Sequence, residues 1–152
     1  MINKKKVLFV SSGGGHWVQM TKIIDGVDFY NLDVEIASVE NVSSFKGFNV
    51  TPLPDFNKSQ LIKTLRGAFN VALYIFSSKP DVAISTGAAP GLVALLIVKF
   101  LGGKTIWIDS IANTEKLSLS GRLASSFCTQ TLTQWPHLSD VKKNVIYKGR
   151  VV

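Results

Sequence analysis

The sequence contains little of what many enzyme and metal-binding classes require. Among 152 residues there are one cysteine, Cys128, and two histidines, His16 and His137. A single cysteine excludes an internal disulfide, which suits a reducing compartment such as the cytoplasm. Because the cysteine and the histidines lie far apart in the sequence, no zinc-ligand spacing is present. We therefore expect this chain to hold no metal ion.

Long apolar segments are also absent. The longest, Leu92–Leu101, is interrupted by Lys99 and is too short to span a bilayer. The N-terminal segment Val7–Val10 is too short for the core of a signal peptide. Yet 46% of the residues are hydrophobic and the mean hydropathy is +0.24, which is high for a soluble domain of this size. This composition predicts a well-covered core, or a surface that meets lipid or a protein partner.

Acidic residues are scarce, with 10 Asp and Glu against 17 Lys and Arg, so the formal net charge is +7. This balance favours polyanions or anionic membrane surfaces. Nucleic acid is the competing interpretation. However, the basic residues are scattered, with one run at Lys4–Lys6, and no nucleic-acid-binding motif accompanies them. We therefore expect no nucleic-acid partner.

Strand and helix patterns alternate along the chain, which predicts one domain over residues 1–152 with an α/β fold: a Rossmann-like, open, mostly parallel sheet with helices on both faces. The first helix offers Val18, Met20 and Ile23 to the core, and a polar loop is expected over Asn41–Gly47. The expected strands are Val7–Ser11, Val34–Val39, Asn49–Thr51, Val82–Ser85, Lys104–Ile108, Thr129–Gln134 and Val145–Lys148. The expected helices are His16–Ile24, Ser59–Ser78, Pro90–Leu101 and Leu117–Phe127.

Two glycine-containing turns are the most informative motifs. Gly13, Gly14, Gly15 and His16 follow the first strand, and Thr86-Gly87 follows the strand Val82–Ser85. Such turns present backbone N–H groups at a helix N-terminus, where anionic phosphate binds, and both fall at the edge of the sheet that holds ligands in open α/β folds. The glycine offsets differ from the dinucleotide-binding fingerprint. The alternative for each turn is an ordinary tight strand-to-helix connection.

His16 is a candidate catalytic base or phosphate ligand, since a neutral imidazole can take a proton near neutral pH. The alternative is a plain residue at a helix start. Asp109-Ser110 ends a strand on the same edge and Glu115 follows in a loop, so that a carboxylate there can bind a sugar hydroxyl or take a proton. Helix capping is the competing role in this region, and the favoured one for Ser118.

Two further features allow two interpretations each. Trp135 fits an aromatic platform for a sugar, or a core or interface residue. The helix over Ser59–Ser78 is either a covering helix or an amphipathic membrane-surface helix, with Lys58, Lys63 and Arg66 at its basic entry and Phe69 in its aromatic body.

Several ordered segments together resemble a known family. They are Val7–His16, Ile84–Gly91, Trp107–Ser110, Leu117–Leu123 and Gln134–Pro136. They resemble the PssD/CpsF-type polysaccharide-biosynthesis proteins, bacterial relatives of the eukaryotic membrane-anchoring subunit that acts in lipid-linked chitobiose synthesis. The resemblance extends from Lys6 to Gly149. The chain is also similar to the N-terminal domain of MurG, which handles an undecaprenyl-diphosphate acceptor.

This resemblance implies the N-terminal, acceptor-side half of a GT-B glycosyltransferase. A separate PssE/CpsG-type subunit would hold most of the nucleotide-sugar (UDP-sugar) donor, so that this chain would bind no cofactor of its own. The acceptor would be a polyprenyl-diphosphate-linked saccharide. The chain would lie on the cytoplasmic face of the membrane, and alone it is expected to be inactive. By resemblance, His16 and Glu115 are catalytic candidates, and the acceptor or phosphate is bound by Gly13, Gly14, Gly15, Thr86, Gly87, Asp109 and Ser110.

Other functional classes remain open on the sequence. One is a non-catalytic scaffold that only recruits the donor-binding subunit to the membrane. Another is a free-standing nucleotide-binding domain, against which the missing dinucleotide fingerprint argues.

Overall fold

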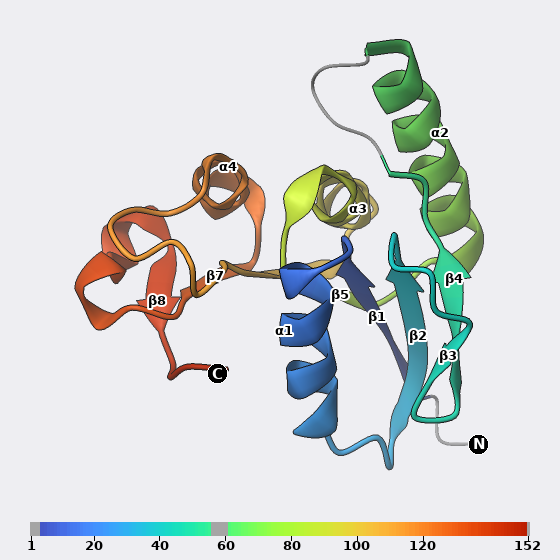
Figure 1. The fold of residues 1–152 in the computed structure, drawn as a ribbon, viewed down its shortest axis with the longest axis horizontal. Helices are drawn as coiled ribbons and strands as arrows, with labels where there is room; N and C mark the ends of the chain where they lie inside the picture. Colours follow the sequence, from blue (N-terminus) through green and yellow to red (C-terminus); the bar gives the residue numbers. More distant parts are fainter. Residues whose placement is uncertain (1–3, 56–60, 152) are drawn as a thin grey trace.

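The computed structural model describes residues 4–55 and 61–151, with backbone alone for 61–63. Its centre is an eight-stranded sheet in the order β3-β4-β2-β1-β5-β6-β7-β8, in which every neighbouring pair is parallel except the antiparallel pair β3–β4 (Figure 1). The strands are β1 (Lys5–Ser11), β2 (Leu32–Ser38), β3 (Ser44–Phe45), β4 (Phe48–Pro52), β5 (Val82–Ser85), β6 (Lys104–Ile108), β7 (Gln130–Thr133) and β8 (Val145–Tyr147).

Helices cover both faces of this sheet. The helices are α1 (Gly15–Asp25), α2 (Leu61–Ser78), α3 (Ala88–Phe100) and α4 (Leu119–Phe127), with 3₁₀ turns at Pro136–Leu138 and Val141–Lys143. Successive side chains of a strand point to opposite faces, so β1 feeds two separate cores. Leu8 and Val10 pack with residues of α2, α3 and α4, whereas Val7 and Phe9 pack with residues of α1. The predicted Rossmann-like architecture is confirmed.

Helix α2 is tied to the sheet by a polar cluster. The carboxylate of Glu35, on β2, accepts hydrogen bonds from Tyr74 Oη (3.0 Å), Lys6 Nζ (3.0 Å) and Ser78 Oγ. Burial acts to raise the pKa of Glu35, but the hydrogen bonds from Ser78, Lys6 and Tyr74 outweigh it and hold that pKa below its ordinary value. The ionised carboxylate therefore stabilises the docking of the C-terminal end of α2.

The structure corrects three expectations about the elements. The predicted loop Asn41–Gly47 contains β3, which forms a hairpin with β4 through Lys46-Gly47, both at positive φ. Val18 is 53% exposed, because α1 turns Gln19, Met20 and Ile24 inward instead. Helix α4 begins at Leu119 rather than Leu117, since the Ser118 side chain accepts the Gly121 N–H and caps the helix.

The strand order fixes where a ligand site is possible. From β1 the chain builds outward through β2 and β4 on one side and through β5 to β8 on the other. The two directions diverge between β1 and β5, and in open α/β sheets ligands bind at the carboxyl ends of the strands at this switch point. The helices that start there are α1 and α3. Among the described residues, no helix is both long and apolar enough to cross a bilayer.

Candidate functional site

The turns after β1 and β5 are bonded to each other at the switch point. His16 Nδ1 lies 2.8 Å from the carbonyl oxygen of Thr86, and Thr86 Oγ1 donates to the carbonyl oxygen of His16 over 2.8 Å. Since Gly14 caps α1 and Gly87 caps α3, this reciprocal pair holds two helix N-termini side by side. The sequence prediction that both turns share one edge of the sheet is confirmed.

This pairing also sets the chemistry of His16. A carbonyl oxygen only accepts hydrogen bonds, so Nδ1 must carry the proton. In the neutral imidazole the second nitrogen, Nε2, then has a free lone pair. The ring lines a cavity at this edge. Its Nε2 can therefore accept a proton from a bound hydroxyl or, once protonated, donate to an anion.

Gly87 allows the imidazole to lie against the backbone. A Cβ at position 87 would be 2.4 Å from Nδ1 and Cε1 of His16, and φ there is +143°. Gly87 N–H also bonds to Ser85 Oγ, and the next residue, Ala88, has φ of +64°, a conformation that alanine rarely adopts. The close approach explains why this turn requires glycine.

The cavity beside His16 has a volume of about 360 Å³ and is bordered by three helix N-termini. His16 stands in the first turn of α1, Ala88 begins α3, and Leu119 and Ser120 begin α4. None of these helices has an acidic residue in its first turn. Helix N-termini carry partial positive charge and N–H groups without intrahelical partners, so this arrangement favours an anionic ligand. The other lining residues are Trp107, Ser110, Ala112, Asn113 and Ser118.

One glycine of the first loop is engaged inside the protein. Gly14 N–H donates to Glu40 Oε2 over 2.8 Å, and a Cβ at Gly13 would be 3.0 Å from the same oxygen. Glu40 thus anchors the loop from the segment after β2. Gly15, the first residue of α1, is exposed. The amides left for an anion in this loop are therefore those of the first turn of α1 beyond Gly14.

Asp109 is an internal anchor, although the sequence suggested it as a ligand contact. The residue is 2% exposed. Its Oδ1 accepts from the Trp107 indole N–H (3.1 Å) and Ser118 Oγ (2.6 Å), and its Oδ2 accepts from Ser118 N–H (2.9 Å) and Asn113 Nδ2 (3.1 Å). All four donors come from the protein itself. The carboxylate thereby shapes the loop after β6 and fixes the N-cap of α4, with Gly121 closely packed against it.

Residues that follow β7 also hold the loop after β6 in place. The Trp135 indole N–H donates to the Ile111 carbonyl oxygen over 2.8 Å, and His137 Nε2 bonds to the Thr114 carbonyl oxygen over 2.7 Å. The Arg150 guanidinium lies 4.3 Å from the centre of the Trp135 ring. Trp135 is therefore a buttress of this loop. Glu115 is exposed on the loop and is not among the residues that line the cavity.

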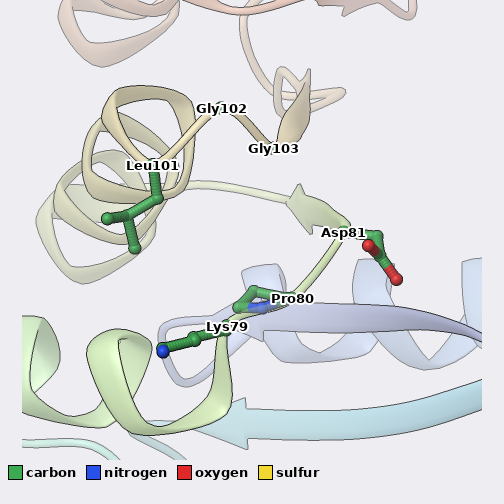
Figure 2. Close-up of a pocket in the computed structure, with 6 residues that line it drawn as sticks. All are labelled: Lys79, Pro80, Asp81, Leu101, Gly102 and Gly103. Atoms are coloured by element: carbon green, nitrogen blue, oxygen red, sulfur yellow. The ribbon is translucent and has the colours of Figure 1, made fainter.

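The described residues of the predicted membrane-facing set are not among those that line the cavity. Arg66 and Phe69 are exposed on α2, while Lys58 and the side chain of Lys63 lie outside the described residues. A second groove, of about 400 Å³, lies at the opposite edge of the sheet, where Lys79–Asp81 lead into β5 and Leu101–Gly103 lead into β6 (Figure 2). Its ionisable residues, Lys79 and Asp81, lie far from the switch point, so this groove is not part of the candidate site.

Thiol chemistry does not contribute to the site. Burial raises the pKa of Cys128 to about 11, which keeps its thiol protonated at neutral pH. Within the described ranges, no group of three or more His, Cys, Asp or Glu side chains is placed to hold a metal ion.

The sequence did not single out several residues of this site. Asn113 and Ser120 line the cavity without a motif of their own, and Ala88 was expected before the helix rather than in it. The role of Glu40 depends on a contact across 26 residues. The sequence did indicate that the region after β6 borders the site, through Asp109-Ser110 at the end of that strand.

Comparison with protein families and known sequences gives one consistent result. A family model described as "Oligosaccharide biosynthesis protein Alg14 like" matches residues 55–151, more than half of the chain. The UDP-N-acetylglucosamine transferase subunit alg14 of Schizosaccharomyces pombe is 27% identical over 179 residues, covering 97% of this chain and 84% of its own. The human subunit ALG14 is 22% identical, with 96% of this chain and 82% of its own covered.

Solved structures show the fold. The crystal structure of Acinetobacter baumannii MurG superposes with a TM-score of 0.72 at 12% identity, covering 95% of this chain and 45% of that one. UDP-N-acetylglucosamine 2-epimerase from Rickettsia bellii gives 0.71 at 9% identity, covering 98% and 46%. The chain thus spans less than half the length of these solved chains. The predicted GT-B type of fold is confirmed.

Proposed function

Since the chain belongs to the Alg14-like family of oligosaccharide biosynthesis proteins, we propose that it is the acceptor-binding and membrane-recruiting subunit of a two-subunit glycosyltransferase. The enzyme transfers a sugar from a UDP-sugar to a polyprenyl-diphosphate-linked saccharide. The names of the fungal and human relatives, UDP-N-acetylglucosamine transferase subunits, support a UDP-linked donor and a second polypeptide. The donor is held mainly by that second subunit, and this chain alone is inactive.

The observation that carries the proposal is the cavity at the switch point. Three helix N-termini without acidic residues in their first turns surround it, which suits the diphosphate of a lipid-linked acceptor. Hydroxyl and amide side chains from Ser110, Asn113 and Ser120 add hydrogen-bonding groups for a sugar. The site thus combines an anion-binding end with a polar rim.

The reaction needs a base, which we assign to His16. The acceptor hydroxyl attacks the anomeric carbon of the donor sugar, a new carbon–oxygen bond forms, and the bond to UDP breaks. The hydroxyl proton passes to His16 Nε2, whose lone pair is free because Nδ1–H is held by the Thr86 carbonyl. Glu115, exposed on the neighbouring loop, is the alternative base.

The biological setting follows from the resemblance of the motifs to PssD/CpsF-type proteins. We propose capsular or exopolysaccharide synthesis at the inner face of a bacterial membrane, with a PssE/CpsG-type donor subunit as partner. Peripheral membrane contact through α2 is supported by the exposure of Arg66 and Phe69.

The test is a transfer assay with a polyprenyl-diphosphate-linked acceptor, using the chain with and without a co-expressed donor subunit. We expect turnover only in the complex, and we expect His16→Ala to reduce that turnover by about 10²–10⁴-fold. Because the substitution also removes the hydrogen bond from His16 Nδ1 to the Thr86 carbonyl, it should lower stability by about 0.5–1.5 kcal/mol, too little to unfold the chain. Robust turnover by the purified single chain contradicts the two-subunit proposal. Retention of transfer within a few-fold in both His16→Ala and Glu115→Gln complexes indicates the scaffold function instead.

A further inference from the structure

A buried glutamine connects the segment after β8 to the loop after β6. Gln134 follows β7 and is 1% exposed. Its Nε2 donates to the Asp109 carbonyl oxygen over 3.0 Å, and its Oε1 accepts the Val151 N–H over 2.9 Å. Because a carbonyl only accepts and a backbone N–H only donates, the amide fits in one orientation. This single side chain therefore bridges two segments that lie far apart in the sequence.

The Asp109 carbonyl oxygen also joins the two walls of the cavity beside His16. Gln19, which lies on α1 and is 3% exposed, donates its Nε2 to the same oxygen over 3.3 Å. Gln19 follows His16 by three residues, which is about one helical turn. Ser110, the residue after Asp109, lines the cavity from the other wall. A shift of this one oxygen therefore changes how the helix that carries His16 meets the loop that carries Ser110.

A second connection runs beside the first. The Arg150 guanidinium lies 4.3 Å from the centre of the Trp135 ring, and the Trp135 indole N–H donates to the Ile111 carbonyl oxygen over 2.8 Å. Both connections start in residues 148–151, here called the tail, and both end on the backbone of the loop after β6. The tail itself is not among the residues that line the cavity.

The tail is attached by these links more than by packing. Lys148, Gly149 and Arg150 are exposed. A small cavity of about 120 Å³ lies between the tail and the side chains of Ile108 and Leu132. Since side chains leave this space unfilled, dispersion contacts hold the tail weakly there. Segments with few packed contacts open at low free energy, so the tail is suited to leave its place while the sheet stays folded.

We propose that Gln134 is a positioning residue that couples the tail to the cavity beside His16. While the tail is seated, Val151 N–H fixes the Gln134 amide, which in turn fixes the Asp109 carbonyl. When the tail leaves, the amide loses one of its two partners and the loop after β6 loosens. The affinity of the cavity for the lipid-linked acceptor thus depends on a segment that does not line it. This last step rests on the proposed function, whereas the coupling itself does not.

The first experiment measures amide hydrogen exchange by NMR in variants of the full chain. Val151→Pro deletes the N–H that Gln134 accepts, and Val151→Ala keeps that N–H as the matched control. Gln134→Leu removes both bonds of the bridge. The reporters are the amides of Asn113 and Ser118, which are hydrogen-bonded to Ser110 and Asp109.

We expect both reporters to exchange about three- to tenfold faster in Val151→Pro and Gln134→Leu, as loss of one hydrogen bond predicts. Amides of β1 should keep their rates, which separates loosening of the loop from general destabilisation. Val151→Ala should stay within twofold of the wild type.

The second experiment uses the assembled transferase. Val151→Pro should raise KM for the lipid-linked acceptor about three- to tenfold and leave kcat within twofold, because His16 stays bonded to Thr86. Val151→Ala should retain both wild-type values. A merely structural role of the tail would lower the amount of folded enzyme, which reduces the apparent kcat and leaves KM unchanged.

Several results would overturn the coupling. Unchanged reporter exchange in both Val151→Pro and Gln134→Leu does so, as does equal acceleration in Val151→Pro and Val151→Ala. Acceleration in Gln134→Leu alone leaves Gln134 as an anchor of Asp109 without a link to the tail. Equal acceleration of the β1 amides indicates general unfolding instead. An unchanged KM in Val151→Pro, with faster reporter exchange, removes the link to acceptor binding. Because exchange needs no substrate and no partner, a complex without transfer activity contradicts the proposed function and leaves the coupling standing.

Discussion

Replacing Asp109 with asparagine distinguishes an internal anchor from a group that acts on substrate. Asparagine keeps the shape of the side chain but changes one carboxylate oxygen into an N–H donor. In the protein both oxygens face fixed donors: the Trp107 indole N–H on Oδ1, and the Ser118 N–H and Asn113 amide on Oδ2. Whichever way the new amide turns, at least one buried N–H group therefore faces another N–H group.

The structure allows a magnitude for this change. A hydrogen bond to a charged group contributes about 1.5–3 kcal/mol, and a buried donor left unpaired costs about as much. Losing one or two such bonds predicts about 3–5 kcal/mol of destabilisation, a large part of a typical stability of about 5–15 kcal/mol. For a chain of this size, this corresponds to a fall in melting temperature of roughly 6–20 °C. Thermal unfolding followed by circular dichroism measures it.

The matched control is Asp33→Asn on β2, where the side chain is 54% exposed and Lys6 Nζ lies 4.0 Å away. This substitution should change stability by only about 0.5 kcal/mol. If Asp109→Asn melts within about 2 °C of the wild type while transfer by the complex is abolished, the anchor interpretation is refuted. Asp109 then acts on the substrate, as the sequence resemblance implied.

Three other outcomes follow from the geometry. Gly87→Ala should destabilise the protein by about 1–3 kcal/mol more than Gly14→Ala, because only the former brings a Cβ to within 2.4 Å of the His16 ring; equal melting temperatures would contradict this contact. The pKa of Glu35 is lowered in the folded protein, so the ionised carboxylate stabilises the fold above the ordinary value of 4.5, and this stabilisation is lost as pH falls through the folded pKa. The melting temperature of Glu35→Gln should therefore fall less steeply in acid than that of the wild type, and an equally steep fall would contradict this role of Glu35. Because burial raises the pKa of Cys128 to about 11, its thiol should react with iodoacetamide at pH 8 far more slowly than free cysteine does. If the folded chain is labelled as fast as free cysteine, the raised pKa is refuted.

Local patterns predicted most of the fold, because its central strands and long helices carry strong signals. The strand Val7–Ser11 is apolar on both faces, as a central parallel strand must be, and α3 is closed by Gly102 at φ +88°. The two-residue strand β3 lacks such a signal, since its pairing depends on the turn at Lys46-Gly47. The direction in which Val18 faces is likewise decided by how α1 packs on the sheet, and not by its helical periodicity.

The position of the site was predictable, whereas the roles of its acids were not. Sheet topology brings the residues after β1, β5 and β6 to one edge, so His16, Thr86 and Ser110 were found together from sequence alone. The role of an acid depends instead on which donors reach it. For Asp109 these come from Trp107, Asn113 and Ser118. Only a three-dimensional structure shows that they fill both oxygens.

The carboxylates of Asp109 and Glu40 are both hydrogen-bonded inside the protein. The four donors to Asp109 are neutral groups, so they solvate its carboxylate without cancelling its charge, and the residue is only 2% exposed. Glu40, the acid nearest the first loop, is bonded to Gly14 and is not among the cavity-lining residues. The His16 ring and the positive N-terminal ends of α1, α3 and α4 therefore face the cavity. Both acids organise the site while leaving its open side favourable to a diphosphate.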